Sequence, residues 1–270
     1  MIASGALQFA FEKATPEGKT TIGVLFLLSM FSWTIIITKF RQLWIARRAS
    51  KKFYAAYAAT RDPLDIHKQD KEFDGAPAFQ LYTRGAEEVA YHLKNNPVKI
   101  QPVVNPSEGA GDPDRLARAT TTKVSQGSFE AAKVVLEEAA AAQAMALEKG
   151  MIVLSTAVAG GPFIGLLGTV WGVMETFAGI AKANQASLTA MAPGVAGALI
   201  ATVVGLMVAI PAMFAYNFMV TTIRNLTQEL DGFAARYANQ IEHTYVDNRD
   251  LEDKFAGALR RVAAEEAVGQ

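Results

Sequence analysis

The sequence predicts an all-α membrane protein with three transmembrane helices, of which the second and third extend into a cytoplasmic helical bundle. Three observations support this fold class. Half of the side chains are hydrophobic, and the charged residues are segregated from three uncharged runs at 20–38, 151–174 and 183–223. Each run comes close to or exceeds the roughly 20 apolar residues that a helix needs to cross a bilayer. The charged remainder of the chain has mainly helical character.

Composition excludes several other classes of protein. Basic and acidic side chains balance at 26 each, so no nucleic-acid partner is indicated. The chain has no cysteine, which excludes disulfides. Residues 1–19 lack the basic start and the small-residue cleavage site of a signal peptide. We therefore expect them to form a short periplasmic N-terminus and the first span to be retained.

The first transmembrane helix is predicted over 20–43. Basic residues follow its apolar run directly: Lys39, Arg41, Arg47, Arg48, Lys51 and Lys52. The positive-inside rule makes this end cytoplasmic. The segment 44–150 is then a cytoplasmic helical region, with a Pro- and Gly-rich loop at 95–113. After this loop, 114–150 is alanine-rich and is expected to enter the second span as one long helix.

The second transmembrane helix is predicted over 151–180. Small residues let helix backbones approach closely in a bilayer, where hydrophobicity alone does not hold helices together. Glycines at three- and four-residue spacing place such residues on one face of this helix: Gly161, Gly165, Gly168 and Gly172. Pro162 follows two glycines, and we expect it to kink the helix.

A periplasmic loop at 181–192 precedes the third transmembrane helix, predicted over 193–222 with Pro193 at its first position. Pro211 is expected to be a second kink. The small-residue face of this helix contains Gly194, Gly197, Ala198, Ala201, Gly205, Ala209 and Ala212. The cytoplasmic helix and tail, 223–270, begin with an apolar stripe at helical spacing: Ile223, Leu226, Leu230, Phe233, Tyr237, Ile241 and Tyr245. That stripe should pack against other helices, those of 44–60 and 76–94 being candidates.

Enzyme chemistry is not indicated. The chain has no phosphate-binding Gly-rich loop with a following lysine and no metal-binding His pair. Its three histidines, at 67, 92 and 243, lie in separate segments. We therefore expect no catalytic, cofactor-binding or metal-binding residues.

The predicted spans contain no interior Asp, Lys, Arg or His, so their deep polar groups are hydroxyls: Ser155, Thr156, Thr169, Thr176 and Thr202. Two interpretations are open. Small residues and isolated hydroxyls could form the wall of a pore that holds another helix. Alternatively, each hydroxyl only bonds the carbonyl one turn back on its own helix. Glu175, at the outer end of the second span, is either a charge at headgroup level or a buried relay.

Two stretches, GGPFIGLLGTVWGVMETFAGIA (160–181) and APGVAGALIATVVGLMVAIPAMFAYN (192–217), resemble the MotA/TolQ/ExbB proton-channel family, in its three-span ExbB/TolQ branch. The resemblance implies a subunit of the bacterial inner membrane, with its N-terminus periplasmic and its C-terminus cytoplasmic. It implies a homo-oligomer, expected to be a pentamer, whose second and third spans surround an ExbD/TolR-type single-span partner. Thr169 and Thr202 match the family's pore threonines. Many family members have a glutamate where this chain has Gly197, so the titrating carboxyl, an aspartate, would come from the partner.

The implied function is a motor subunit that uses the proton motive force to energise periplasmic or outer-membrane transport or envelope processes. Several alternatives remain open: a TolQ-like or gliding-type motor paralogue, a four-span flagellar-type stator, a secondary transporter acting alone, and a non-conducting assembly scaffold. An inverted repeat and a deep charged site, which a transporter would need, are not evident in the sequence.

Overall fold

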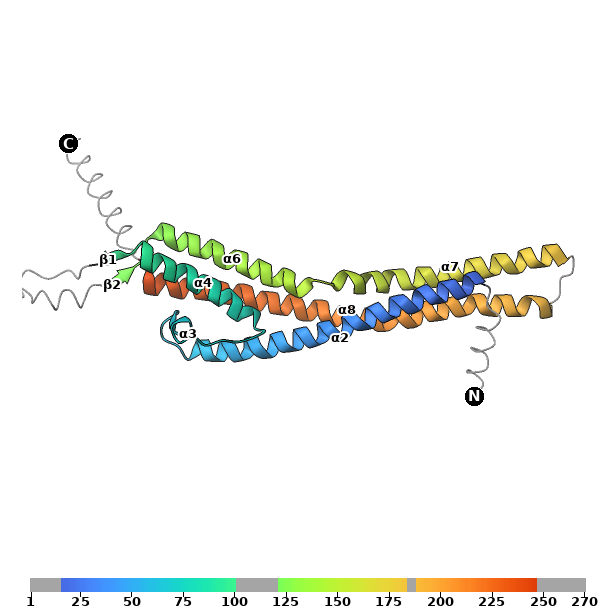
Figure 1. Cartoon of the computed structure of the whole chain (residues 1–270), viewed down its shortest axis with the longest axis horizontal. Coiled ribbons are helices and arrows are strands. Elements are labelled where there is room, and N and C mark those ends of the chain that lie inside the picture. The colour runs from blue at the N-terminus through green and yellow to red at the C-terminus, as the bar shows by residue number, and fades with distance from the viewer. Residues whose placement is uncertain (1–15, 101–120, 184–187, 247–270) are drawn as a thin grey trace, which may run out of the picture. The chain divides into compact units, whose positions relative to one another are not determined.

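The structure is a computed structural model that describes residues 16–100, 121–183 and 188–246. Within these ranges, three helices are long and apolar enough to cross a membrane: Gly18–Ala58, Met151–Lys182 and Gly194–Tyr245. The predicted all-α membrane fold with three spans is confirmed. The elements in chain order are α2 (Pro16–Ala58), α3 (Asp65–Lys68), α4 (Pro77–Asn95), β1 (Val98–Ile100), β2 (Thr121–Lys123), α6 (Gln126–Glu148), α7 (Met151–Ala183) and α8 (Leu188–Tyr245) (Figure 1).

Two short strands occur between the helices of the described ranges. β1 and β2 pair antiparallel, with Val98 opposite Lys123. β1 lies inside the segment expected to be a loop, 95–113, and the rest of that loop from residue 101 lies outside the described residues. β2 replaces the beginning of the expected 114–150 helix, because α6 starts only at Gln126.

The expected continuous helix from 114 into the second span is wrong at a second place. α6 ends at Glu148 and α7 begins at Met151. Between them Gly150 adopts a φ of 87°, a left-handed conformation that glycine accepts without steric cost and that commonly ends a helix. The Lys-Gly pair before the apolar run was the available sequence signal for this helix end.

The hairpin between the second and third spans is shorter than predicted. α7 continues to Ala183 and α8 already begins at Leu188, so helix occupies much of the expected 181–192 loop. Pro193 is therefore inside α8 rather than at its first position. α7 continues as α-helix through Pro162, and α8 continues through Pro211.

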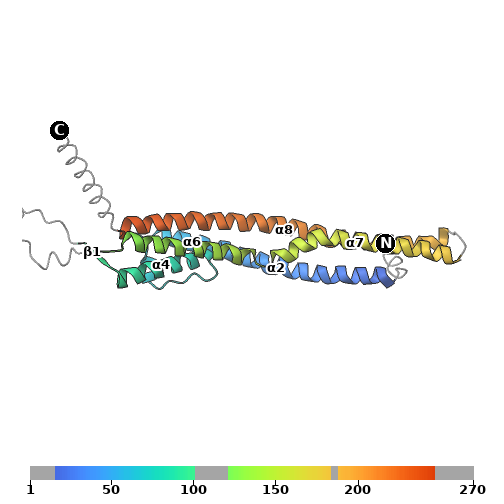
Figure 2. The ribbon, with the colours of Figure 1, turned by 90° about the horizontal axis from the view of Figure 1, so that it is seen from above.

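The chain divides into two compact units, which are described separately. Unit 1 comprises Met1–Trp44 and Ala146–Asn225, and unit 2 comprises Ile45–Met145 and Leu226–Gln270. Within unit 1, α7 runs alongside the first part of α8, as the views in Figures 1 and 2 agree. Their contact is made by small residues, and it contains the hydroxyl pair described in the next section.

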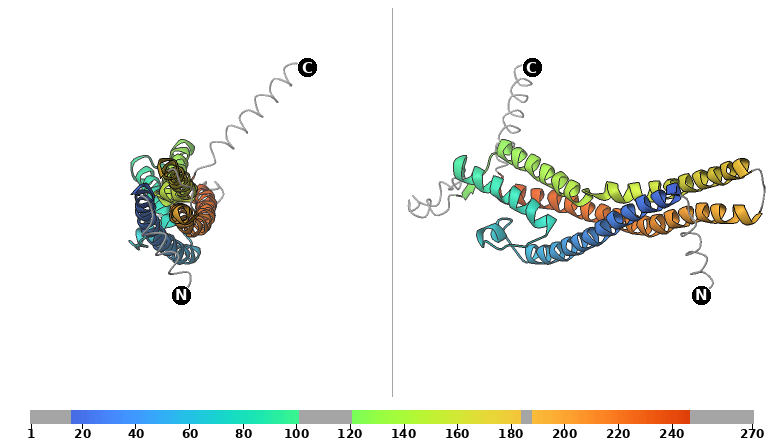
Figure 3. Two further views of the ribbon diagram at one scale, coloured as in Figure 1. Left: turned by 90° about the vertical axis from the view of Figure 1, so that its right-hand side faces the viewer. Right: turned by 45° about the vertical axis from the view of Figure 1, so that its right-hand side comes forward.

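Unit 2 is held together by an aromatic core. Phe53 of α2 meets Phe233 of α8 edge to face, with ring centroids 5.4 Å apart, and Tyr82 of α4 lies 5.1 Å from Tyr237. All four side chains are at most 2 % exposed. This confirms that the apolar stripe after the third span packs against the helices of 44–60 and 76–94. The right view of Figure 3 shows α4 and α6 beside the end of α8.

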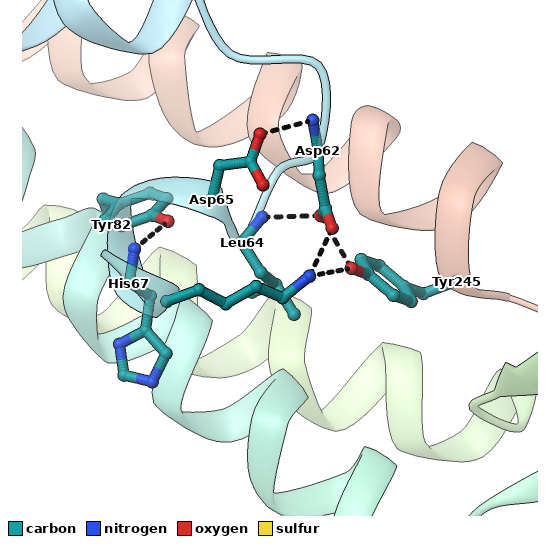
Figure 4. A network of polar contacts seen from close by, with 7 residues as sticks. Asp62, Leu64, Asp65, His67, Tyr82 and Tyr245 are labelled. Carbon is teal, nitrogen blue, oxygen red and sulfur yellow. Dashed lines mark hydrogen bonds and ion pairs between the residues drawn. The ribbon is translucent and has the colours of Figure 1, made fainter. Parts of the chain in front are cut away.

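A polar network ties the α2–α3 loop of unit 2 to the end of α8 (Figure 4). Asp62 accepts hydrogen bonds from Lys68, from the Tyr245 hydroxyl at 2.6 Å and from the Leu64 backbone N–H at 2.9 Å. Burial of the Asp62 carboxyl opposes its ionisation, but these donors outweigh it and hold the pKa of Asp62 below its ordinary value. The hydrogen bond to Asp62 raises the pKa of Lys68.

Candidate functional site: the α7–α8 contact

The glycines of α7 bring its backbone against α8. A Cβ added at Gly165 would lie 2.9 Å from the Thr202 Cα, and one at Gly172 would lie 2.7 Å from the Ala198 Cβ. At Gly205 the added Cβ would meet the Gly161 carbonyl oxygen at 2.6 Å. Side chains larger than hydrogen therefore cannot be accommodated at these positions without moving the helices apart.

The same pattern continues along the contact. A Cβ at Gly168 would meet the Ala201 Cβ at 2.5 Å, and one at Gly194 would collide with Thr176. Gly161, Gly165, Gly168, Gly172 and Gly205 are buried in this contact. They were expected to be both packing surface and pore wall. In the structure they are covered by the neighbouring helix of the same chain, so packing is the role that their geometry supports.

Thr169 and Thr202 lie together at the centre of this contact. Their Oγ1 atoms are 3.3 Å apart, although 33 positions separate them in the sequence. The Thr202 hydroxyl also donates to the carbonyl oxygen of Gly165, on the opposite helix, at 3.0 Å. Both threonines are half-buried, so the pair reaches the surface of the two-helix contact.

Thr202 differs from the four hydroxyls of α7 that make local hydrogen bonds in where its own hydrogen bond goes. Thr169 donates to Leu166 O at 2.7 Å, and Thr176 donates to Gly172 O at 2.8 Å, each about one turn back on its own helix. Ser155 and Thr156 both bond Ile152 O in the same manner. The local interpretation of the hydroxyls thus describes these four bonds, whereas the bond from Thr202 to Gly165 O crosses between helices.

The pair can pass on a hydrogen bond, but it cannot store a proton. Each threonine hydroxyl has one hydrogen and two lone pairs. Leu166 O, Gly165 O and the partner hydroxyl are three acceptors within reach of two hydrogens. The Thr202 hydrogen can therefore switch between Gly165 O and Thr169 Oγ1. Lone pairs of the two hydroxyl oxygens remain free to accept a hydrogen bond from a water or an incoming carboxylic acid. A group that titrates near neutral pH has to come from elsewhere.

The other predicted site residues differ in how far they are buried. Gly197 and Ala198 are buried in α8, Gly194 and Pro162 are half-buried, and Pro211 is exposed. Glu175 is half-buried, and its Oε2 atom is buried without a hydrogen-bond partner among the described residues. It is not brought to the threonine pair, because it lies six positions beyond Thr169 on α7, about 9 Å farther along the helix.

Two contacts within unit 1 were not foreseen. Thr21 of α2 packs its methyl group onto α7, 3.1 Å from where a Gly168 Cβ would be. Lys39 of α2 is only 6 % exposed, and its ammonium donates to the carbonyl oxygen of Leu147 at 3.0 Å and to Gln42 Oε1 at 2.9 Å. The Lys39 charge thus caps the C-terminal end of α6. The only sequence signal for this contact was a lysine that precedes the other basic residues of α2. The neighbouring sequence does not indicate which residue the lysine contacts.

No group of three or more His, Asp or Glu side chains within the described ranges is placed to hold a metal ion.

Comparison with known proteins places the chain in a family. The sequence model of the MotA/TolQ/ExbB proton channel family matches residues 111–232, which include both threonines. The chain is 31% identical over 191 residues to the Tol-Pal system protein TolQ of Pseudomonas aeruginosa, covering 70% of this chain and 72% of that protein. It is 28% identical over 225 residues to TolQ of Haemophilus influenzae, covering 83% and 88%. It is 29% identical over 240 residues to the biopolymer transport protein ExbB of Salmonella typhimurium, covering 89% and 85%. The chain therefore belongs to the MotA/TolQ/ExbB proton channel family, as a multi-pass protein of the inner membrane.

Proposed function

We propose that this chain is the channel subunit of a proton-driven motor, in which Thr169 and Thr202 line the proton pathway. Members of its family are proton-channel proteins that energise transport or envelope processes. The observation that carries the proposal is the hydroxyl pair, 3.3 Å apart, within a contact otherwise built from glycine and alanine. A hydrogen bond that crosses between membrane helices at depth, where each polar group is costly, supports a role beyond local bonding.

The partner in this proposal is an ExbD/TolR-type single-span protein that supplies a titrating aspartate. The described parts of the apolar stretches place no acidic side chain beside the threonine pair, and hydroxyls do not titrate near neutral pH. A carboxylic acid on a partner helix could exchange hydrogen bonds with the free lone pairs of Thr169 and Thr202. Five copies of the chain would surround the partner helices.

The topology in this proposal has the N-terminus in the periplasm and the C-terminus in the cytoplasm. Its support is the basic cluster after the first apolar run and Arg224 after the third. Glu175 then lies near the periplasmic mouth of the pathway.

The test is proton flux into vesicles that contain the chain together with its co-purified single-span partner. Valine has nearly the shape of threonine but no hydroxyl. Thr169→Val and Thr202→Val should each lower the flux by at least about tenfold, the loss expected of a missing proton-transfer group. Thr202→Ser should retain most of it. Thr221→Val is the matched control, because Thr221 is exposed on the same helix and bonds Asn217 O one turn back.

Partner co-purification is measured in parallel, to show that the assembly still forms. Full flux from both valine variants would remove the two threonines from the pathway. Flux through the chain without any partner would contradict the assignment of the titrating carboxyl to a second protein. Absence of flux in the unmodified complex would favour the non-conducting scaffold.

A further inference from the structure

The helix α2 presents a continuous cationic face where its apolar part ends. Between Thr20 and Ala58 it contains no Asp or Glu. Five cations lie exposed on it, here called the basic collar: Arg41, Arg47, Arg48, Lys51 and Lys52. α6 differs in this respect, because its exposed surface mixes Glu130, Glu137 and Glu138 with Lys133, as a merely solvated helix does.

The helical repeat gathers the basic collar on one side of α2. At about 100° per residue, Phe40, Trp44, Arg47 and Lys51 fall within roughly 60° of one another. Arg41, Arg48 and Lys52 form a second row beside them. The opposite side of the same helix is packed, since Leu43, Ala46, Ser50 and Phe53 are at most 3 % exposed. The collar is thus fixed in direction, facing away from the protein core.

Exposed aromatic residues lie directly before the cations on this face. Phe40 is 53 % exposed and Trp44 is 57 % exposed. Tryptophan and other aromatic rings favour the boundary between lipid tails and headgroups. With a rise of about 1.5 Å per residue, Arg47 and Arg48 lie about 4.5 and 6 Å beyond Trp44 along the helix. That distance is about the thickness of one headgroup layer.

Lys51 and Lys52 lie about 10–12 Å beyond Trp44. Their flexible stems allow the ammonium groups to reach back toward the headgroups. Arg41, Arg47, Lys51 and Lys52 form no ion pair with any residue that the structure describes. Their charges are therefore not neutralised by the described part of the chain.

We propose that the basic collar is a binding site for acidic phospholipid headgroups. The aromatic rings would set the depth of α2 in the bilayer, and the cations would hold the lipid phosphates and their negative headgroups. Each cation near an acidic lipid surface strengthens binding by about fivefold. The site would be occupied by lipids such as phosphatidylglycerol in preference to zwitterionic lipids.

Trp44 is a reporter inside the proposed site. The chain has three tryptophans, and the changes Trp33→Phe and Trp171→Phe leave Trp44 alone. In this background the full-length protein is placed in vesicles of phosphatidylcholine and phosphatidylglycerol. Two samples are compared: in one the phosphatidylcholine carries brominated acyl chains, and in the other the phosphatidylglycerol does. Brominated chains quench tryptophan fluorescence. Stronger quenching by brominated phosphatidylglycerol, at equal mole fraction, measures the local preference for the acidic lipid.

The collar variant carries Arg47→Gln, Lys51→Gln and Lys52→Gln, and it should lose about tenfold or more of this preference. Its matched control, Lys94→Gln with Lys133→Gln and Arg236→Gln, removes three exposed cations of unit 2 outside α2 and should keep the preference. A charge-conserving variant, Arg47→Lys with Lys51→Arg and Lys52→Arg, should keep it as well, which guards against a folding defect in the glutamine variant.

Three results would overturn the proposal. The first is an unchanged preference in the collar variant, and the second is an equal loss in the control variant. The third is abolition of the preference by millimolar inorganic phosphate at matched ionic strength, because the site would then be one for the free anion rather than for a lipid.

Discussion

Gly165→Ala tests whether the α7–α8 contact sets the geometry of the threonine pair. The added Cβ would lie 2.9 Å from the Thr202 Cα and 3.0 Å from the Ala201 carbonyl oxygen. Carbon atoms prefer about 3.5–4.0 Å, so the helices must separate by roughly 0.5–1 Å. Both contacting atoms belong to backbone, which cannot swing aside as a side chain can. Over-packing of this kind costs about 1–3 kcal/mol.

The matched control is Gly160→Ala, five positions earlier on the same helix, where an added Cβ meets nothing within 4 Å. Both changes bring the same gain in helix propensity, so their difference reports the collision alone. The assay is the apparent midpoint of thermal unfolding of the purified protein in detergent. With about 2–4 °C per kcal/mol for a chain of this size, Gly165→Ala should melt roughly 2–12 °C below Gly160→Ala.

The same displacement should weaken the hydrogen bond from Thr202 to Gly165 O, which is measured at 3.0 Å. Proton flux of Gly165→Ala with the partner present should therefore fall, whereas that of Gly160→Ala should not. Equal melting midpoints for the two variants would refute the close contact. Lower stability of Gly165→Ala with undiminished flux would keep the contact but separate it from the proton pathway.

Three further predictions concern contacts and backbone geometry that lie within one unit each. Lys39→Met removes the buried ammonium at the end of α6 and should destabilise the protein by about 1–2 kcal/mol, whereas Arg224→Met, which removes an exposed cation, should not. Gly150→Ala forces a side chain into a φ of 87°, where its Cβ would make only an ordinary contact, 3.8 Å from Lys39 Cε. It should therefore cost about 1–2 kcal/mol of backbone strain, whereas Gly127→Ala within α6 should not destabilise. Asp62→Asn should reduce the stability that unit 2 loses when the pH is lowered. The reduction should be at most about 1 kcal/mol, because this network is partly exposed.

The sign of the last prediction follows from the two pKa shifts. The pKa of Asp62 is lowered on folding, so its contribution is complete above the unfolded carboxyl pKa and is lost as the pH falls through the folded one. The pKa of Lys68 is raised, so its contribution is complete below the unfolded pKa and is lost as the pH rises through the folded one. Thermal unfolding followed across acidic to alkaline pH measures both limbs. If Asp62→Asn lost as much stability on acidification as the unmodified protein, the role of the network would be contradicted. Equal melting midpoints of Lys39→Met and Arg224→Met would contradict the Lys39 cap. Equal midpoints of Gly150→Ala and Gly127→Ala would contradict the Gly150 strain.

Local sequence patterns were sufficient for the features that one helix determines by itself. The length of the apolar runs decided that there are three candidate spans, because hydrocarbon thickness fixes the number of residues. Helical spacing identified the stripe with Leu230, Phe233 and Tyr237, which is buried as expected. The glycine spacing on α7 also indicated the face that packs against a neighbouring helix.

Features that join distant segments were decided only in three dimensions. The sequence offered two interpretations of the hydroxyls, and only the register of α7 against α8 gives Thr202 an acceptor on the opposite helix while Thr169 keeps one on its own. The partner of Lys39 is 108 positions away, and the pairing of β1 with β2 joins strands on either side of an intervening segment. Periodicity encodes which face of a helix is apolar, because that depends on neighbours one turn away. It does not encode which atom of another element that face meets, because that depends on the packing of backbones far apart in the chain.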